Sequence, residues 1–449
     1  MILYKEASVR ERKKRYFDQN STQSEQNSFT IPGLILTAVI CGLMLIAFSS
    51  TSPAQTNGEW PAFHGTDRTN KSAETGLLKT WPAEGPKLEW TASGLGVGYS
   101  SISIADGMIF TAGESGAQST IFAYDLDGKL LWQTDNGVSY TTELSWAKTY
   151  TGSRATPTYD KGVIYHLAES GRLAAIEAKT GKELWSKELR QEYDAELPMY
   201  GYAESVLIDG DRLYCNPVGK KAFMVCLDKS DGSLIWANTD IQGSEGYSSG
   251  IIAEFGGFRQ IINYSGFGIY GIDSKTGRLL WTQEIKSKHS LNSTDAIYHD
   301  GYVLASTGYG AGTMLIKLTA SNGNISPEVV WKNELMDNHH GGVILHEGHV
   351  YGAGHEARGW FCLDFMTGKE VWKARGKGSL TFADNKLYIL EEKGGVRLVE
   401  ATPVSFKERG SFETPEGGKG MYWAHPVVCG GRLYVRHTDK LFAYNIKGN

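Results

Sequence analysis

The chain has 449 residues, including 54 glycines, 23 tyrosines and 12 tryptophans, and its formal net charge is −5. This glycine-rich and aromatic-rich composition favours an all-β fold. The basic residues form no stripe, so the charge pattern excludes nucleic acid as the expected partner.

The N-terminal 48 residues predict export. Residues 1–30 are polar and carry a basic cluster, and residues 31–48 form an 18-residue apolar run without charge. Such a run behind a basic flank predicts one hydrophobic helix, with the N-terminus in the cytoplasm and the rest in the periplasm or cell envelope. Ser52-Pro53-Ala54 resembles a small-residue cleavage site. Both a cleaved signal peptide and a retained transmembrane anchor therefore stay open.

Residues 49–85 contain Gly, Pro and Thr without sustained periodicity. We expect a linker that crosses the surface of the following domain. Trp60, Phe63 and Trp81 are the side chains expected to attach this linker to the domain, because large aromatic rings gain most from burial.

Residues 86–449 repeat one pattern, which is clearest in FCLDFMTGKEVW at Phe361–Trp372. Its first residues alternate like a half-buried strand, Thr367-Gly368-Lys369 forms a turn, and a second strand ends at the Trp. Further copies end at Trp132, Trp185, Trp236 and Trp281, and looser copies end at Trp331 and Phe412. The Trp residues are 41 to 53 positions apart, which is the length of one four-stranded propeller blade.

The two ends of the repeat region complement each other. Trp90 ends a repeat that lacks its preceding strands, and residues 433–446 begin a repeat that lacks its Trp strand. Joined, they complete one blade and remove two open sheet edges. The sequence therefore predicts an all-β, eight-bladed β-propeller closed by both termini. Seven blades is the alternative if the copy at Phe412 does not form a unit.

Four cysteines lie outside the apolar run. Cys226 and Cys362 occupy the same place in different repeats, so they are expected in separate blades and unpaired. Cys215 and Cys226 lie on neighbouring strands of one predicted hairpin, where both a disulfide and two free thiols remain open.

Polar residues recur where each repeat enters its first strand. Aligning the repeats on the Gly before the second strand places a chemically varied set six or eight residues earlier: Arg154, Glu204, Asp295, His340, Lys377, Trp423 and His425. In a propeller these loops share one face around the axis, where ligands commonly bind. The set therefore predicts a site for a small polar ligand at the channel mouth, with polar lining of the channel as the alternative.

Five histidines fall in one repeat: His339, His340, His346, His349 and His355. His346 and His349 flank a turn at the opposite end of a strand from His340, roughly 20 Å away at about 3.3 Å per residue. One metal ion cannot bind all five, so no metal site is predicted.

The repeat at Phe361–Trp372 and at Tyr270–Trp281 resembles the pyrroloquinoline-quinone (PQQ) type propeller repeat. Asn338-His339-His340-Gly341-Gly342 and Trp423-Ala424-His425-Pro426 are similar to segments of exported bacterial PQQ-binding-like propeller proteins. The resemblance covers residues 60 to 449 and implies the fold. For function it implies two classes, quinoprotein alcohol or sugar dehydrogenases and an envelope protein-assembly scaffold, since one fold can serve many functions.

As a quinoprotein-like oxidoreductase, the chain would use PQQ with calcium as cofactors, and Asp295 is then the best candidate for a catalytic base. However, the chain has no adjacent Cys pair and no CxxCH haem motif, both of which occur among quinoprotein dehydrogenases. Three hypotheses therefore remain: binding of a quinone, sugar or alcohol, oxidation of an alcohol or sugar, and binding of an envelope protein.

Overall fold

The computed structural model describes residues 58–140, 150–241, 243–285, 287–415, 418 and 420–448. The predicted hydrophobic helix at residues 31–48 lies outside this part of the chain. Among the residues that are described, no helix is both long and apolar enough to cross a membrane.

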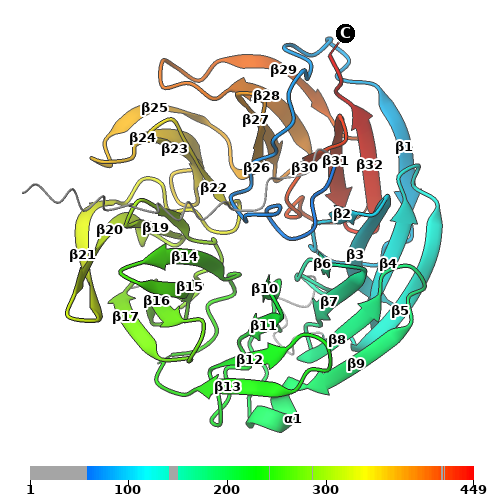
Figure 1. Cartoon of the computed structure of the whole chain (residues 1–449). Coiled ribbons are helices and arrows are strands. Elements are labelled where there is room, and N and C mark those ends of the chain that lie inside the picture. Colours follow the sequence, from blue (N-terminus) through cyan, green and yellow to red (C-terminus); the bar gives the residue numbers. More distant parts are fainter. Residues whose placement is uncertain are drawn as a thin grey trace, which may run out of the picture. The chain divides into compact units, whose positions relative to one another are not determined.

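Eight four-stranded antiparallel sheets form a ring, which confirms the predicted eight-bladed β-propeller (Figure 1). Blades 1 to 4 follow one another in the chain. Blade 1 consists of β2 (Ser103–Ala105), β3 (Met108–Ser115), β4 (Gln118–Asp125) and β5 (Leu130–Val138), and blade 2 of β6 (Thr158–Asp160), β7 (Val163–Leu167), β8 (Arg172–Glu177) and β9 (Glu183–Glu188). Blade 3 consists of β10 (Leu207–Asp209), β11 (Arg212–Cys215), β12 (Met224–Asp228) and β13 (Leu234–Asn238), and blade 4 of β14 (Ile251–Phe255), β15 (Phe258–Tyr264), β16 (Gly268–Asp273) and β17 (Leu279–Glu284). The short helix α1 (Leu189–Tyr193) follows β9.

Blades 5 to 7 repeat this order. Their strands are β18 (Ile297–His299), β19 (Tyr302–Thr307), β20 (Gly312–Ser321) and β21 (Asn324–Asn333); β22 (Val343–His346), β23 (His349–Gly354), β24 (Gly359–Asp364) and β25 (Glu370–Arg375); β26 (Gly378–Ala383), β27 (Lys386–Glu391), β28 (Gly395–Glu400) and β29 (Glu408–Glu413). Because β29 contains Phe412 and completes a four-stranded sheet, the seven-blade alternative is wrong.

Blade 8 joins the two ends of the propeller. It consists of β30 (Val427–Cys429), β31 (Arg432–His437), β32 (Lys440–Asn445) and, as its outer strand, β1 (Leu88–Ser93). β1 pairs with β32 in antiparallel register, with Thr91 opposite Phe442. The predicted closure by both termini is therefore confirmed.

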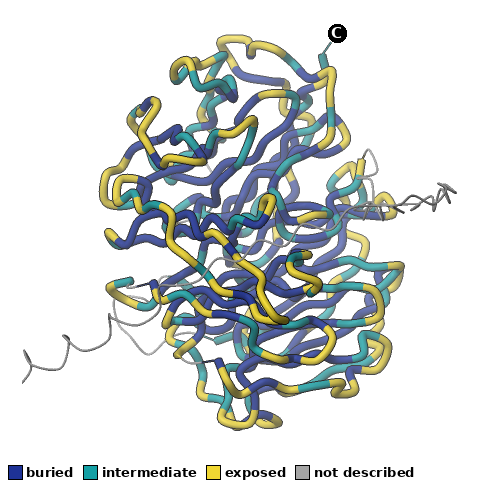
Figure 2. Tube along the Cα trace, turned by 60° about the vertical axis from the view of Figure 1, so that its left-hand side comes forward, coloured by how far each residue is buried: buried dark blue, intermediate teal, exposed yellow. Residues whose placement is uncertain are grey.

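The core lies between neighbouring blades rather than in one central mass. Tyr165 and Leu173 of blade 2, for example, belong to the same buried cluster as Val206 and Leu213 of blade 3. Figure 2 shows the buried residues running through the sheets, while many of the turns are exposed. Each blade thus buries its apolar face only against its neighbours, which explains why the ring must close.

The repeated Trp binds each blade to the next. In six cases its indole Nε1–H donates to a backbone carbonyl in the following blade: Trp90 to Leu126, Trp132 to Ala178, Trp185 to Lys229, Trp236 to Ser274, Trp331 to Phe365 and Trp372 to Thr402. Trp281 is different, because its Nε1–H donates to Gln260 Oε1 of its own blade at 2.7 Å.

The turn glycine of a repeat lies directly under the indole of the Trp that ends the preceding repeat. At Gly277 an added Cβ would come within 2.6 Å of the Trp236 ring, and φ is +75°. Gly323 has nearly the same φ, +74°, but nothing lies within 4 Å of an added Cβ. The pair therefore separates backbone strain from contact between blades.

We expect Gly277→Ala to destabilise the fold more than Gly323→Ala. Both changes carry the backbone cost of a positive φ, roughly 1–2 kcal/mol. Only Gly277→Ala also forces the Trp236 ring aside, which adds about 1–3 kcal/mol. Urea unfolding of the two variants measures the difference, and equal losses would mean that the indole does not hold the turn.

The described cysteines are all buried and free. Cys215 lies opposite Val225, whereas Cys226 lies opposite Tyr214. Because the two thiols are offset by one residue in register, their side chains point to opposite faces of the sheet. The open alternative of a Cys215–Cys226 disulfide is therefore wrong, and the expectation that Cys226 and Cys362 stay unpaired is confirmed.

Candidate functional site

Residues 60–72, here called the axial segment, lie on the axis of the ring. The segment contacts the inner strand, or the loop leading into it, of all eight blades: Ile104, Tyr159, Ser205, Gly250, Asp295, Leu345, Phe382 and His425. Only a position on the axis allows thirteen consecutive residues to reach every blade. The segment expected to cross the surface therefore passes through the centre instead.

The axial segment is a narrow loop that enters from one side. Near its ends it pairs with inner strands close to their turns, Trp60 with Ile104 and Lys71 with Phe382. Its tip, at Arg68, reaches residues that precede β10 and β14. The loop thus enters from the face with the inner-strand turns and ends beneath the opposite face, here called the loop face.

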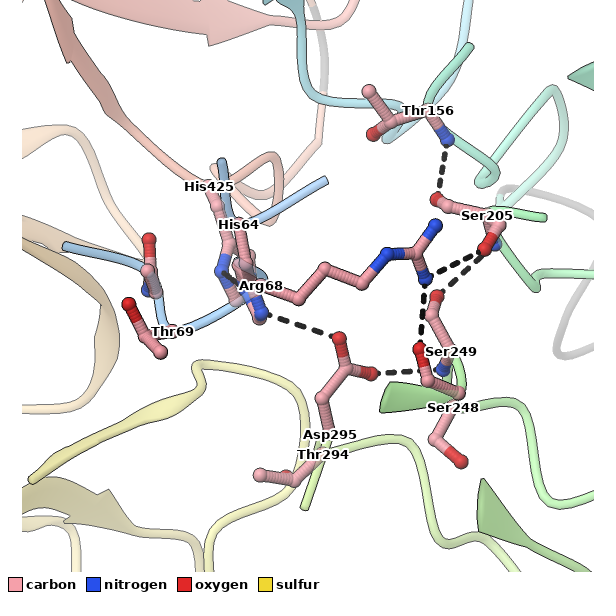
Figure 3. Close-up of polar contacts among 12 residues, drawn as sticks. His64, Arg68, Thr69, Thr156, Ser205, Ser248, Ser249, Thr294, Asp295 and His425 are labelled. Atoms are coloured by element: carbon pink, nitrogen blue, oxygen red, sulfur yellow. Dashed lines mark hydrogen bonds and ion pairs between the residues drawn. The ribbon is translucent and has the colours of Figure 1, made fainter. Parts of the chain in front are cut away.

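Arg68 anchors the tip. Its Nη1 donates to the carbonyl of Ser205 at 3.0 Å (Figure 3) and to that of Gly250 at 3.1 Å. Its Nη2 donates to the carbonyl of Val206. Burial lowers the pKa of Arg68, whereas the nearby carboxyls of Asp295 and Glu204 act in the opposite direction. This buried guanidinium therefore connects blade 3 with blade 4.

His64, Asp295 and His425 form a chain beside Arg68 (Figure 3). His64 Nδ1 lies 3.2 Å from Asp295 Oδ2, and His64 Nε2 lies 2.9 Å from His425 Nδ1. The other oxygen of Asp295 accepts the backbone N–H of Ser249 at 2.8 Å. Burial, followed by the His64 ring, lowers the pKa of His425 well below its usual range. Asp295, the candidate base, thus faces the chain's own groups and is only 5% exposed.

Glu204 lies in the same buried layer. Its two carboxylate oxygens accept the backbone N–H and the side-chain amide of Asn216, and the amide of Asn263. Burial raises the pKa of Glu204 to about 8, although Asn216 and Arg68 oppose the shift. Near neutral pH the protonated form of this carboxyl is therefore favoured in the folded protein.

We expect Glu204→Gln to flatten the dependence of stability on pH. An unfolded Glu releases its proton near pH 4.3, whereas the folded one keeps it until about pH 8. The wild type should therefore lose stability as the pH rises through this window, by about 3–5 kcal/mol from this group. Chemical unfolding between pH 4 and 9 measures the slope. Glu328→Gln, at an exposed position, is the control and should leave the slope unchanged.

A second group lies nearer the loop face and centres on Glu392. One oxygen, Oε1, lies 3.4 Å from His340 Nε2 and 3.2 Å from Lys377 Nζ, and it accepts the indole N–H of Trp423 at 3.0 Å. Burial would raise the pKa of Glu392, but these three partners outweigh it and lower the pKa to about 2. Three of the predicted site residues therefore converge on a carboxylate that the sequence did not identify.

Arg154 joins this group through aromatic rings. Its guanidinium donates to the carbonyls of Gly152 and Tyr150 and lies 5.8 Å from the centroid of the Tyr99 ring. The rings of Tyr99 and Tyr150 each lie 5.1 Å from Trp423. Among the described residues, Arg154 is thus held by backbone carbonyls and an aromatic face.

The seven predicted residues therefore fall into two layers. Glu204, Asp295 and His425 are buried against the axial segment, whereas Arg154, His340, Lys377 and Trp423 are half-buried near the loop face. The repeat register predicted one axis for all seven residues, but it did not reveal that the axis is filled. His64 and Arg68 were missed because they lie outside the repeats. The sequence signal that could have identified them is the presence of an Arg and a His in a segment that also contains aromatic residues.

Aromatic and imidazole rings continue from Trp423 across the loop face. Consecutive rings lie 4.6 to 4.9 Å apart in the order Trp423, His340, His339, Tyr309 and His289. Within the described residues, no group of three or more His, Cys, Asp or Glu side chains is arranged to hold a metal ion.

These residues do not fit a PQQ and calcium site. A polyanionic quinone needs cations that are free to pair with it. Arg68 and Arg154 donate to backbone carbonyls, and Lys377 pairs with Glu392. The axial segment also occupies the centre of the ring. These side chains are therefore assigned no role in the chemistry of this cofactor.

The open space on the loop face lies beside the axis. A cleft of about 700 Å³, here called the loop-face cleft, is formed by the loops that precede β10, β14 and β18 and by the β11–β12 and β19–β20 connections. Its lining includes Tyr200, Tyr247, Tyr309, His289 and Glu245. Tyr309 and His289 also belong to the row of rings that reaches Trp423. The cleft therefore combines enclosed volume with aromatic and ionisable groups.

Parts of this chain are similar in sequence to known proteins. The outer membrane protein assembly factor BamB of Salmonella typhimurium is 26% identical over 144 residues, which is 32% of this chain and 32% of that protein. The quinoprotein alcohol dehydrogenase PedH of Pseudomonas putida is 30% identical over 160 residues, which is 33% of this chain and 25% of that protein. The chain thus spans about a third or less of the length of these two relatives.

Solved structures show the same fold. BamB from Moraxella catarrhalis covers 80% of this chain with a TM-score of 0.55 and 16% identity, and all of that chain is matched. Quinohemoprotein alcohol dehydrogenase from Comamonas testosteroni covers 87% of this chain and 81% of its own, with a TM-score of 0.58 and 12% identity. At these identities the likeness concerns the fold.

A family model described as outer membrane protein assembly factor BamB matches residues 117–374, which is more than half of the chain. The matched range runs from blade 1 into blade 6 and includes the repeats on which the PQQ-like resemblance rests. This chain therefore belongs to the PQQ-like propeller family described as outer membrane protein assembly factor BamB.

Proposed function

We propose that this protein is an exported binding propeller of the cell envelope that holds a small polar ligand in the loop-face cleft. The observation that carries the proposal is the cleft itself. Its volume of about 700 Å³ lies within the roughly 300–1,000 Å³ typical of small-molecule sites. The axis is filled by the chain's own residues, so we place the ligand in the cleft beside it.

The lining suits a ligand with several polar groups. Tyr200 and Tyr247 meet edge to face with their centroids 5.8 Å apart, and His289 and Tyr309 do so at 4.7 Å. Such rings offer flat apolar faces together with hydroxyl or ring nitrogen atoms. Sugars and other polyols present the matching combination of C–H faces and hydroxyl groups.

Export is part of the proposal. It rests on the apolar run at residues 31–48 behind the basic cluster, and on relatives that assemble outer membrane proteins. Whether the segment is cleaved or retained as an anchor does not alter the proposed binding site.

A polypeptide-binding scaffold is the second candidate. It is favoured by the family match and by the filled axis, which removes the space where the predicted mouth residues were to bind a ligand. An oxidoreductase is the third candidate from the sequence. Arg68 and Lys377 already have partners within the chain, so they give this candidate no support.

Thermal unfolding with a ligand panel tests the proposal. Among sugars, polyols and amines, a ligand that fits the cleft should raise the melting temperature with increasing concentration, because a ligand that binds only the folded state stabilises it. Tyr247→Ala should abolish the rise, whereas Phe258→Ala, at the β14–β15 turn, should keep it. A response only to an unfolded outer membrane polypeptide would favour the scaffold, and a response only to PQQ with calcium would favour the dehydrogenase.

A further inference from the structure

The ionisable groups of the loop-face cleft are mainly acidic. Asp194, Glu196 and Glu245 line it, and Lys220 is the one Lys among the described lining residues. Lys220 Nζ already lies 3.5 Å from Asp194 Oδ2. Two carboxyls thus remain without an ammonium partner from the part of the cleft lining that the structure describes.

Glu245 is the buried one of these two. It is only 5% exposed although it lines the cleft, so it lies at the base. Its Oε1 accepts the backbone N–H of Ala203 at 3.4 Å, and its Oε2 has no hydrogen-bond partner among the described residues. An unpartnered buried carboxyl oxygen costs about 1–3 kcal/mol, which a ligand donor would recover.

Aromatic rings surround the same space. Tyr200, Tyr247, Tyr309 and His289 line the cleft together with Glu245. The faces of such rings attract cations, by about 0.5–2 kcal/mol for each well-placed ring. Carboxyl groups and ring faces together favour the binding of a positively charged ligand over that of a neutral polyol.

We propose that the loop-face cleft recognises a cationic nitrogen, an ammonium or guanidinium group, that pairs with Glu245 at its base. The inference rests on the proposed function and narrows it to ligands that carry an amine. Two sources supply this chemistry, a free small amine and the Lys side chain of a polypeptide, and the test separates them.

Binding should release a proton. Burial, followed by the neighbouring Glu204, raises the pKa of Glu245 well above its usual range, although Ala203 and Arg154 oppose the shift. A cation that arrives at the base of the cleft stabilises the carboxylate, so the carboxyl proton passes to solvent as the ion pair forms. The other ionisable groups of the described lining are Asp194, Glu196, Lys220, His289 and the hydroxyls of Tyr200, Tyr247 and Tyr309.

The sign of the pH dependence follows. At low pH the ligand must displace the Glu245 proton, so affinity for the cation should increase as the pH rises. It should decrease again only when the amine itself loses its proton, near pH 10.4 for a Lys side chain. A neutral ligand should show neither limb.

Isothermal titration calorimetry of the full chain tests the inference with four probes. These are cadaverine, the blocked peptide Gly-Lys-Gly, the matched neutral peptide Gly-norleucine-Gly, and trehalose. We expect the two cations to bind more tightly than the norleucine peptide and to release about one proton, seen as a heat that depends on the buffer. Binding of the Lys peptide alone assigns the source to a polypeptide, and equal binding of cadaverine assigns it to a free amine.

Glu245→Gln provides the matched variant. Because burial raises the pKa of Glu245 and so disfavours the charged form, the uncharged amide should fold, which circular dichroism checks. We expect it to weaken cation binding by about tenfold or more and to abolish proton release. Glu328→Gln, exposed on β21, should change neither.

Two results would overturn the inference. If the norleucine peptide or trehalose binds as well as the cations, or if Glu245→Gln binds cations unchanged, the cleft does not read positive charge, yet the proposed binding function stands. If none of the four probes binds, the inference fails and the proposed small-ligand function fails with it.

Discussion

Deletion of residues 433–449 is expected to abolish the soluble, monomeric fold. The deletion removes β32 and nearly all of β31, which join β30 to β1 in blade 8. Two strands would then present unpaired N–H and C=O groups, which promote edge-to-edge aggregation. Buried side chains such as Val435, Phe442 and Ile446 would also leave the core between blades 7 and 8. Size-exclusion chromatography of the truncated protein should show aggregates or no soluble product.

A shorter deletion provides the control. Removing residues 447–449 leaves all four strands of blade 8 and loses mainly the bridge between Lys447 and Leu77. This variant should stay monomeric with a modestly lower melting temperature. A soluble 433–449 deletion that melts like the wild type would show that the ring does not depend on closure by its ends.

Arg68→Ala is expected to destabilise the protein by about 3–5 kcal/mol, the range for removing one partner from a buried charged network. The substitution removes the Arg68 donor from the carbonyls of Ser205 and Gly250. The carbonyl of Val206 then keeps only the hydroxyl of Thr158 as its donor. It also removes the cation that faces Asp295 and Glu204. Equilibrium unfolding in urea gives the magnitude.

Arg375→Ala is the matched control for this variant. Arg375 is exposed at the end of β25, so its loss should cost less than about 0.5 kcal/mol. If Arg68→Ala cost no more than Arg375→Ala, the axial segment would contribute little to the ring, and its place on the axis would be in doubt.

Most of the fold was predictable because each repeat carries its own turn and strand signals. Phe361–Trp372 contains the turn glycine and the Trp that recur in the other blades, so errors in one copy are corrected by the others. The split blade followed from counting, since Trp90 lacked strands that residues 433–446 supply. The hydrogen bond of Trp281 was not predictable. Its partner Gln260 lies in the same blade, and no position of the repeat indicates this partner.

The site was only partly predictable. Counting back from the repeat glycine placed His340, Lys377 and Trp423 together, but Glu392 follows β27 and lies outside the positions that were compared. The axial segment has no periodicity, so its course depends on contacts with residues hundreds of positions away. Tyr200 and Glu245 lie in loops of different lengths, where register no longer predicts which side chains meet.

Chemical footprinting of the ligand-free protein tests most directly whether the axis is filled and the cleft beside it is open. Hydroxyl radicals followed by mass spectrometry should modify Met199, which lines the cleft and is 53% exposed, and spare the fully buried Met336. Diethyl pyrocarbonate should modify the exposed His299 and spare His64 and His425. Ready modification of His64 and His425 in the folded protein, with Met199 protected, would contradict the account.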